Sequence, residues 1–225
     1  GLPFKGITFG IDVSSDYQAK KLKKIKHGYR FDLKTPDETY KDVCLNLIGR
    51  HNVTNALAAI AIAEQSGLNA SEFLHTLENF PGVYRRMNVY KWNESIIIDD
   101  YAHHPSEIRS VYNTIRNFYP LCKNCVVFQP HLYSRTRDFM KEFSIILSMF
   151  DEVILLDIYP AREMPIEGIN SKILLNNISK RKKRSISKTK IKTALEESDA
   201  KIFAILGAGD IGLEIKKLNL KKIGL

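Results

Sequence analysis

The sequence of 225 residues has no long apolar run and only three cysteines. No stretch of about 18 apolar residues occurs, which excludes a membrane-spanning helix. The start, GLPFKGITFG, lacks the basic-then-apolar pattern of a secretory signal. It is also typical of a strand, so we expect a piece of a longer chain. An odd number of cysteines does not make a disulfide framework and is typical of the reducing cytoplasm. We therefore expect a cytoplasmic protein without membrane contact.

Two of the cysteines, Cys122 and Cys125, form a C-x-x-C motif. A structural zinc site needs a second pair, and only Cys44 remains. A redox motif opens a helix, whereas the letters CVVFQP at this point are typical of a strand. The pattern favours neither role, and we expect no metal site.

Basic residues outnumber acidic ones, and the formal net charge is +9. The densest basic run is KRKKR at 180–184. A basic surface can bind nucleic acid or an anionic small substrate. No aromatic side chain interleaves with this run, which favours a solvated face over a nucleic-acid interface. A basic nucleic-acid-binding module remains the alternative from another functional class.

The first part of the chain has the pattern of a mixed α/β region. Apolar side chains alternate with polar ones near 7–11, 29–33 and 43–47, which predicts half-buried antiparallel strands. The stretch HNVTNALAAIAIAEQSG has helical spacing and stops at Gly67, and a second short helix is predicted over 70–79. The letters FPGVYRR then indicate a domain boundary.

From residue 84 onward the apolar runs no longer alternate. Continuous apolar runs separated by helical patterns are typical of a mostly parallel sheet with helices on both faces. We therefore predict two α/β domains, 1–83 and 84–225. The predicted strands of the second domain are 95–99, 125–129, 152–157 and 202–206, and its predicted helices are 105–118, 135–149, 171–179 and 209–218.

The letters ILGAGDIG at 205–212 match the G-x-G-x-x-G fingerprint of dinucleotide-binding folds. A working fingerprint lies in the first β-α-β unit of its fold and is followed about 20 residues later by an acidic residue. Gly207 lies close to the end of the sequence, so we expect no further strand after it. We interpret these glycines as allowing the last helix to start close to the sheet, and not as an NAD site.

Polar residues crowd the ends of two predicted strands, as DYAHHPSE (100–107) and PHLYSRTR (130–137). Ligands of open parallel sheets bind outside the carboxyl ends of the strands, so these clusters form one wall if the two strands are neighbours. Arginine in such a wall suits a phosphate and a second anionic group. A metal site from Asp100, His103 and His131 lacks the helical spacing of zinc proteases and is not favoured.

A third polar cluster, GRHNVTN at 49–55, opens the predicted first helix. His51 and Asn55 are four residues apart and therefore share one face of that helix. They can contact the edge of a base, because Asn offers both a donor and an acceptor. Capping of the helix by His51 or Asn52 explains the same letters, and the pattern leaves both interpretations open.

The sequence resembles the Mur ligase family of peptidoglycan synthesis along essentially its whole length. Within it, QPHLYSRT resembles the branch of the family that adds L-alanine. Six stretches carry the resemblance, in this order: GRHNVTNALAAIAIAEQSGL, FPGVYRRM, IIDDYAHHPSEI, FQPHLYSRTRDF, LLDIYPARE and GAGDI.

Members of this family have a UDP-sugar-binding domain, a central ATPase domain and a Rossmann-like carboxyl-terminal domain. The resemblance implies that 1–83 are the end of the ATPase domain and that 84–225 are the Rossmann-like domain. The first domain, the phosphate-binding loop G-x-x-G-K-T and the central magnesium ligands are then missing, and no G-K-[ST] occurs in the sequence. We therefore expect this chain to be inactive alone.

The resemblance implies an ATP-dependent ligase that joins L-alanine to UDP-N-acetylmuramate, with ATP and Mg²⁺ as cofactors. The muramyl carboxylate attacks the γ-phosphate of ATP, and the alanine amine then displaces phosphate from the acyl phosphate. The alternative enzyme is a tripeptide-recycling murein ligase of the same family. The sequence leaves the oligomeric state undecided.

The resemblance also implies roles for particular residues. The implied nucleotide contacts are His51 and Asn55 to adenine, Asp100 to ribose and Arg86 to the phosphates, with Arg85 a weaker candidate. The implied L-alanine pocket contains Tyr101, His103, His131 and Arg135, with Arg135 on the alanine carboxylate and the catalytic candidates His103 and His131 near the amine.

Overall fold

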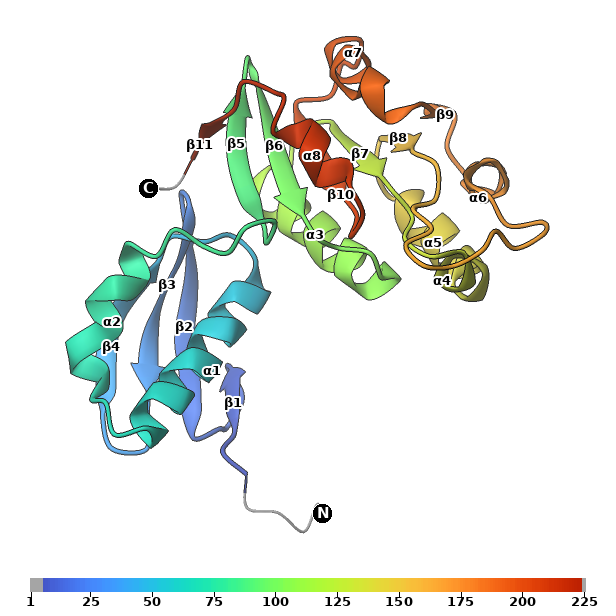
Figure 1. Cartoon of the computed structure of the whole chain (residues 1–225). Helices are drawn as coiled ribbons and strands as arrows, with labels where there is room; N and C mark the ends of the chain where they lie inside the picture. The colour runs from blue at the N-terminus through green and yellow to red at the C-terminus, as the bar shows by residue number, and fades with distance from the viewer. Residues whose placement is uncertain (1–5, 224–225) are drawn as a thin grey trace. The chain divides into compact units, whose positions relative to one another are not determined.

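The computed structural model describes residues 6–223, which form two compact units (Figure 1). The first unit reaches Gly82, and the second extends from Val83 to Ile223. Each unit has a sheet of its own and is described by itself. None of the helices within 6–223 combines the length and the apolar character that a bilayer span requires.

The first unit is a four-stranded sheet in the order β1-β2-β3-β4. β1 runs parallel to β2, so the antiparallel pairing predicted for the strand near 7–11 is wrong, because its neighbour is β2 and a loop returns the chain in the same direction. The other neighbouring strands are antiparallel. Helix α1 packs on β1 and β2, and α2 packs on β4. The elements are β1 (Phe9–Ile11), β2 (Tyr17–Ile25), β3 (Gly28–Lys34), β4 (Thr39–Leu45), α1 (Arg50–Gln65) and α2 (Ala70–Glu78).

Alternation of apolar side chains builds the core of this unit. Phe31 and Leu33 of β3 are buried on one face, as are Leu45 of β4 and Leu57 of α1. The strands predicted near 29–33 and 43–47 and both helices are therefore confirmed. β2 was not predicted, because its lysines and the register shift between Lys20 and Lys23 interrupt the alternation.

The second unit is a seven-stranded sheet in the order β11-β5-β6-β10-β7-β8-β9. The pairs between β6, β10, β7, β8 and β9 are parallel, which confirms the predicted parallel sheet. β5 and β11 extend it in antiparallel fashion and were not predicted, nor was β9. The strands are β5 (Asn88–Trp92), β6 (Ser95–Asp100), β7 (Asn124–Phe128), β8 (Glu152–Leu155), β9 (Lys183–Ser185), β10 (Ile202–Leu206) and β11 (Lys221–Lys222).

Helices cover both faces of this sheet (Figure 1). Alternate strand residues such as Ile97 and Phe203 pack into one apolar cluster with residues of α7 and α8. On the other face, the rings of Phe128 and Phe143 lie 5.4 Å apart, so β7 packs against α5. The helices are α3 (Pro105–Phe118), α4 (Tyr133–Asp138), α5 (Met140–Leu147), α6 (Ser171–Asn177), α7 (Ile191–Glu196) and α8 (Ile211–Ile215).

The predicted helix at 105–118 has the signals of a capped start. Pro105 occupies its first turn, and the ring of His104 accepts the amide of Ser106. The side chain of Glu107 accepts the amides of His103 and His104 at 2.8 and 3.0 Å. His104 is therefore the N-cap residue of α3. The helix predicted over 135–149 is instead divided into α4 and α5 at Phe139.

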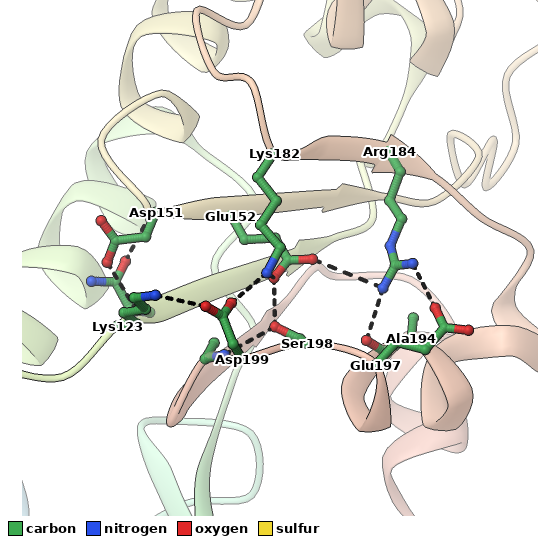
Figure 2. A network of polar contacts seen from close by, with 11 residues as sticks. Lys123, Asp151, Glu152, Lys182, Arg184, Ala194, Glu197, Ser198 and Asp199 are labelled. Carbon is green, nitrogen blue, oxygen red and sulfur yellow. Dashed lines mark hydrogen bonds and ion pairs between the residues drawn. The ribbon is translucent and has the colours of Figure 1, made fainter.

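A network of charged side chains holds β9 at the edge of the sheet, near the amino ends of the parallel strands (Figure 2). Glu152, whose side chain is only 4% exposed, lies 3.0 Å from Nζ of Lys182 and accepts the hydroxyl of Ser198 at 2.5 Å. Arg184 lies 3.8 Å from the same carboxylate and 2.7 Å from that of Glu197. The predicted solvated face at KRKKR is therefore only partly correct, because Lys182 and Arg184 neutralise a buried acid.

Candidate active site

The two polar clusters after β6 and β7 meet at the carboxyl edge of the second unit's sheet. β10 lies between these strands, so the condition under which the wall was predicted, that β6 and β7 are neighbours, is not met. The loops that follow β6 and β7 nevertheless approach each other across the end of β10. The ring centroids of His103, after β6, and His131, after β7, are 6.0 Å apart. One wall forms as predicted, but from loops of non-adjacent strands.

The loop that follows β10 packs closely against Gln129 and Tyr159 because it contains two glycines, Gly207 and Gly209. Gly207 has a φ of 146°, which side chains rarely tolerate. A Cβ on Gly209 would lie 2.5 Å from Oε1 of Gln129 and 2.6 Å from Cγ of Tyr159. Any side chain at Gly209 would therefore displace the loops after β7 and β8, which meet beside it.

The glycine loop also directs its carbonyl oxygens at a buried arginine. Nη2 of Arg85 donates to the carbonyl of Gly207 at 2.6 Å, and Nη1 donates to that of Gly209 at 3.3 Å. Nε of Arg85 pairs with Asp99 at 3.1 Å. Carbonyl oxygens repel a phosphate, so these contacts agree with a packing role for the two glycines. The guanidinium of Arg85 already has partners in this loop and in Asp99. A further strand, β11, does follow the loop, contrary to expectation, but it pairs antiparallel to β5.

Four rings form a continuous row along the site. Tyr101 contacts His103 edge to face at 5.4 Å, and His103 lies 6.0 Å from His131. Tyr159, from the loop after β8, stacks on His131 at 5.6 Å with the rings inclined by 18°. The guanidinium of the exposed Arg86 lies 5.8 Å from the Tyr101 ring, which adds a cation to one end of the row.

Two nitrogen atoms in this wall are buried and have no hydrogen-bond partner among the described residues. They are Nδ1 of His131 and Nη1 of Arg135. Burying an unpaired polar atom costs free energy, so such atoms are uncommon in folded proteins unless something else completes their bonding. Both belong to the segment 131–135, which indicates a polar ligand site at this turn.

The electrostatics of the wall favour a neutral His131. Burial lowers the pKa of His131, and the nearby Arg135 and His103 lower it further. Nδ1 of His103 lies 2.9 Å from the carbonyl oxygen of Tyr101, which can only accept, so this nitrogen carries the proton. A neutral imidazole of His131 in this cationic wall can accept a proton from a reacting group.

Asp100 is a structural residue of the site. Its buried carboxylate accepts the amide of Met87 on Oδ2 and the amide of Ala102 on Oδ1, each at 2.8 Å. These bonds fix the turn after β6 against the segment that precedes β5. Any contact of Asp100 with a ligand would be made in addition to them.

The third cluster lies in the first unit, at the start of α1. The helix follows Gly49, and no side chain caps it, so the interpretation that His51 or Asn52 caps the helix is wrong. The buried Asn52 instead donates to the carbonyl of Ile48 at 2.8 Å. His51 is half-buried and Asn55 is exposed.

The sequence matches known domains over both units. Residues 2–63 match the Mur ligase middle domain, and residues 85–212 match the Mur ligase glutamate ligase domain. This chain belongs to the Mur ligase family. Among curated members of the family, the UDP-N-acetylmuramate–L-alanine ligase of Christiangramia forsetii is 46% identical over 97% of this chain and 49% of its own length. The ligase of the same name from Flavobacterium psychrophilum is 46% identical over 99% of this chain.

Solved structures of Mur ligases and related enzymes have the same fold. The UDP-N-acetylmuramate–alanine ligase of Thermotoga maritima superposes with a TM-score of 0.75 at 26% identity, over 94% of this chain and 46% of its own length. Folylpolyglutamate synthase of the same organism superposes with a TM-score of 0.70 at 20% identity, which shows a shared fold. The chain spans about half the length of the curated Mur ligases that it matches.

Two residues of the candidate site were not predicted from the sequence, Tyr159 and Glu163. Tyr159 stacks on His131, and Glu163 accepts the amide of Ser134 at 2.9 Å. Both lie within the stretch LLDIYPARE, which was singled out only for its resemblance. Between residues 6 and 223, no three His, Cys, Asp or Glu side chains come together as metal ligands.

Proposed function

We propose that this chain provides the amino-acid site of an ATP-dependent ligase that joins L-alanine to UDP-N-acetylmuramate through an acyl phosphate. The curated relatives that bear this name are 46% identical to it over nearly its whole length. Peptidoglycan synthesis in the cytoplasm is the corresponding process. The tripeptide-recycling alternative is tested below with the same assay.

The observation that carries this proposal is the convergence of His103, His131 and Arg135 at one edge of the sheet. The two histidine rings are 6.0 Å apart, and the wall contains a buried unpaired nitrogen of Arg135. A guanidinium binds a carboxylate through two parallel hydrogen bonds, which suits the carboxylate of an amino acid. Tyr101 contacts His103 edge to face at the end of the same row of rings.

The neutral imidazole of His131 supports the second half of the reaction. The alanine amine attacks the acyl carbon, the C–O bond to phosphate breaks, and phosphate leaves with the bonding electron pair. The nitrogen loses a proton in this step, and the lone pair of His131 or His103 can accept it. Arg135 would hold the alanine while this occurs, which converts an encounter into a positioned reaction.

The nucleotide contacts are proposed from the family resemblance. Arg86 is exposed beside Tyr101 and is available to a phosphate, while Asp100 would contact the ribose, and His51 and Asn55 the adenine. Mg²⁺ would accompany ATP, but the described residues contain no ligand set for it, and we assign it no step. We therefore propose that the chain alone does not turn over ATP.

The basic run at 180–184 does not favour nucleic-acid binding. Three of its cations contact groups of this chain: Lys182 pairs with Glu152, Lys183 donates to the carbonyl of Ile178 at 2.6 Å, and Arg184 pairs with Glu197. Cations that already have partners gain less from a phosphate backbone. A nucleic-acid module would show salt-dependent affinity for DNA or RNA, and absence of binding at low salt would exclude it.

The proposed activity is tested by adding the part of a relative's length that this chain does not span. We would join the amino-terminal part of the Christiangramia forsetii ligase to this chain at the boundary of the match and measure phosphate release with UDP-N-acetylmuramate, ATP and L-alanine. Strong preference for L-alanine over glycine, serine and a free tripeptide is expected. Equal use of these substrates would contradict the alanine assignment, and preference for the tripeptide would favour the recycling ligase.

Arg135→Ala in this fusion should raise the KM for L-alanine by about 10-fold to 100-fold, the worth of a charge-assisted contact, with little change in the KM for ATP. Arg137→Ala is the matched control, because Arg137 is exposed and pairs with Asp138 at 2.8 Å. Equal increases in both KM values would refute the proposed pocket.

A further inference from the structure

The loop that joins β8 to α6 lies against the turn that carries His131. The amide of Leu132 donates to the carbonyl of Tyr159 at 2.9 Å, and the amide of Tyr159 donates to the carbonyl of Pro130 at 2.8 Å. These two bonds form a parallel bridge between His131 and Tyr159, and the two rings stack. The backbone and the rings of the two segments are therefore fixed together.

Glu163 of the same loop binds the first turn of α4. Its Oε2 accepts the amide of Ser134 at 2.9 Å, and its Oε1 accepts the hydroxyl of Ser134. These bonds lower the pKa of the Glu163 carboxyl. Free amides at a helix start favour an acidic partner, and here the acid comes from a distant loop.

The start of α4 needs such an external partner. The residue at its N-cap position is Leu132, whose side chain cannot accept a hydrogen bond, and no side chain caps the helix from that position. Leu132 also has a φ of 74°, an unfavourable conformation for a leucine. A strained turn without its own cap keeps its geometry only if its surroundings hold it.

We propose that Glu163 is a positioning residue of the amino-acid site: by binding Ser134 it holds the first turn of α4, and thereby the guanidinium of Arg135, in the orientation that receives the substrate carboxylate. This inference rests on the proposed function of that site. Glu163 is not a direct ligand of the substrate carboxylate, because both of its oxygens bind Ser134 and two carboxylates repel each other.

The contact itself can be tested on this chain without any activity. Amide hydrogen exchange of Ser134, measured by NMR, should be slow in the protein and at least about tenfold faster in Glu163→Ala, since the amide loses its acceptor. Glu167→Ala is the matched control, because Glu167 is an exposed carboxylate of the same loop. Unchanged exchange of Ser134 in Glu163→Ala would overturn the inference.

The positioning role is tested in the active fusion. Glu163→Ala should raise the KM for L-alanine by about tenfold or more, because a small displacement of a binding group is costly, and should leave the KM for ATP unchanged. Glu163→Gln, which keeps one acceptor oxygen for Ser134, should recover part of the loss, and Glu167→Ala should match the parent. Melting of each variant, followed by the fluorescence of Trp92, identifies any that fail to fold.

The outcomes separate the two proposals. A parent fusion that makes no product contradicts the proposed function, while the exchange of Ser134 still decides the contact. An active parent in which Glu163→Ala leaves the KM for alanine unchanged, or raises both KM values equally, overturns the positioning role alone. If Glu163→Ala does not fold, the KM for L-alanine and the KM for ATP are measured in Glu163→Gln and Ser134→Ala instead. A rise in the KM for L-alanine alone supports the positioning role, and an unchanged KM for L-alanine or equal rises in both overturn it.

Discussion

Arg85 and Arg86 are adjacent in the sequence and yet have different environments. Arg85 is buried and binds Asp99 and the carbonyls of the glycine loop. Arg86 is exposed, with its guanidinium near the ring of Tyr101. Arg85 has a φ of 55°, so the backbone turns sharply at this point. Two residues of the same type therefore differ in what they can bind: Arg85 already has partners, whereas the guanidinium of Arg86 is exposed.

Asp99 gives a pH-dependent contribution to stability. Burial raises its pKa from 3.8 to about 6, although the neighbouring Arg85 acts in the opposite direction. The folded protein then binds a proton that the unfolded chain has already lost, so this contribution is fully present below pH ~4 and is lost as the pH rises through about 6. We expect a loss of roughly 3 kcal/mol over this range.

The measurement compares the protein with Asp99→Asn, which does not titrate. Urea unfolding is followed by the fluorescence of Trp92, the only tryptophan in the sequence and a buried residue of the second unit. The stability of the protein relative to the variant should fall between pH 4 and pH 7. A difference that does not change with pH would show that Asp99 titrates at an ordinary pKa.

Among the elements, β9 is a short basic strand at the edge of the sheet. Its neighbourhood depends on the buried carboxylate of Glu152. Lys182, just before β9, and Arg184, within β9, pair with this carboxylate, and Ser198 of the segment before β10 donates its hydroxyl to it (Figure 2). Cationic residues on an edge strand also discourage pairing with another chain. This network lies near the amino ends of the parallel strands, whereas the candidate site lies at their carboxyl ends. The basic run therefore stabilises the fold away from the candidate site.

Glu152→Ala should destabilise the second unit by about 2 kcal/mol or more, because two cations lose their buried partner. Glu196→Ala is the control, since this exposed carboxylate only approaches Lys192 at 3.9 Å, and it should cost less than about 0.5 kcal/mol. Denaturant unfolding followed by Trp92 fluorescence measures both. Equal effects of the two substitutions would show that the network contributes nothing beyond surface charge.

At the scale of the whole molecule, the chain consists of two units with separate cores. Residues 83–225 contain the seven-stranded sheet, its helices and the aromatic row. We expect a polypeptide of this range to fold alone and to keep the midpoint of the Trp92 unfolding transition seen in the full chain. Loss of the cooperative transition would show that the second core depends on the first unit.

Local patterns predicted several elements to the residue. The run IFAIL is β10 over the predicted range, and the helix predicted from 105 to 118 is α3. In both cases the determinants are close in sequence: a run of apolar side chains that is buried on both faces, or a proline and a glutamate in a first turn. β2 and β9 were missed for the opposite reason, because their lysines are typical of exposed loops.

The sequence by itself determined the parallel sheet, the family and the residues that gather at the strand ends. Only the tertiary structure decided that β10 separates β6 and β7, that His103 and His131 meet across it, and that Glu163 binds Ser134. The reason is physical. Helical turns and strand alternation depend on residues a few positions apart, whereas strand order and loop contacts depend on packing between segments far apart in the chain, which no local pattern records.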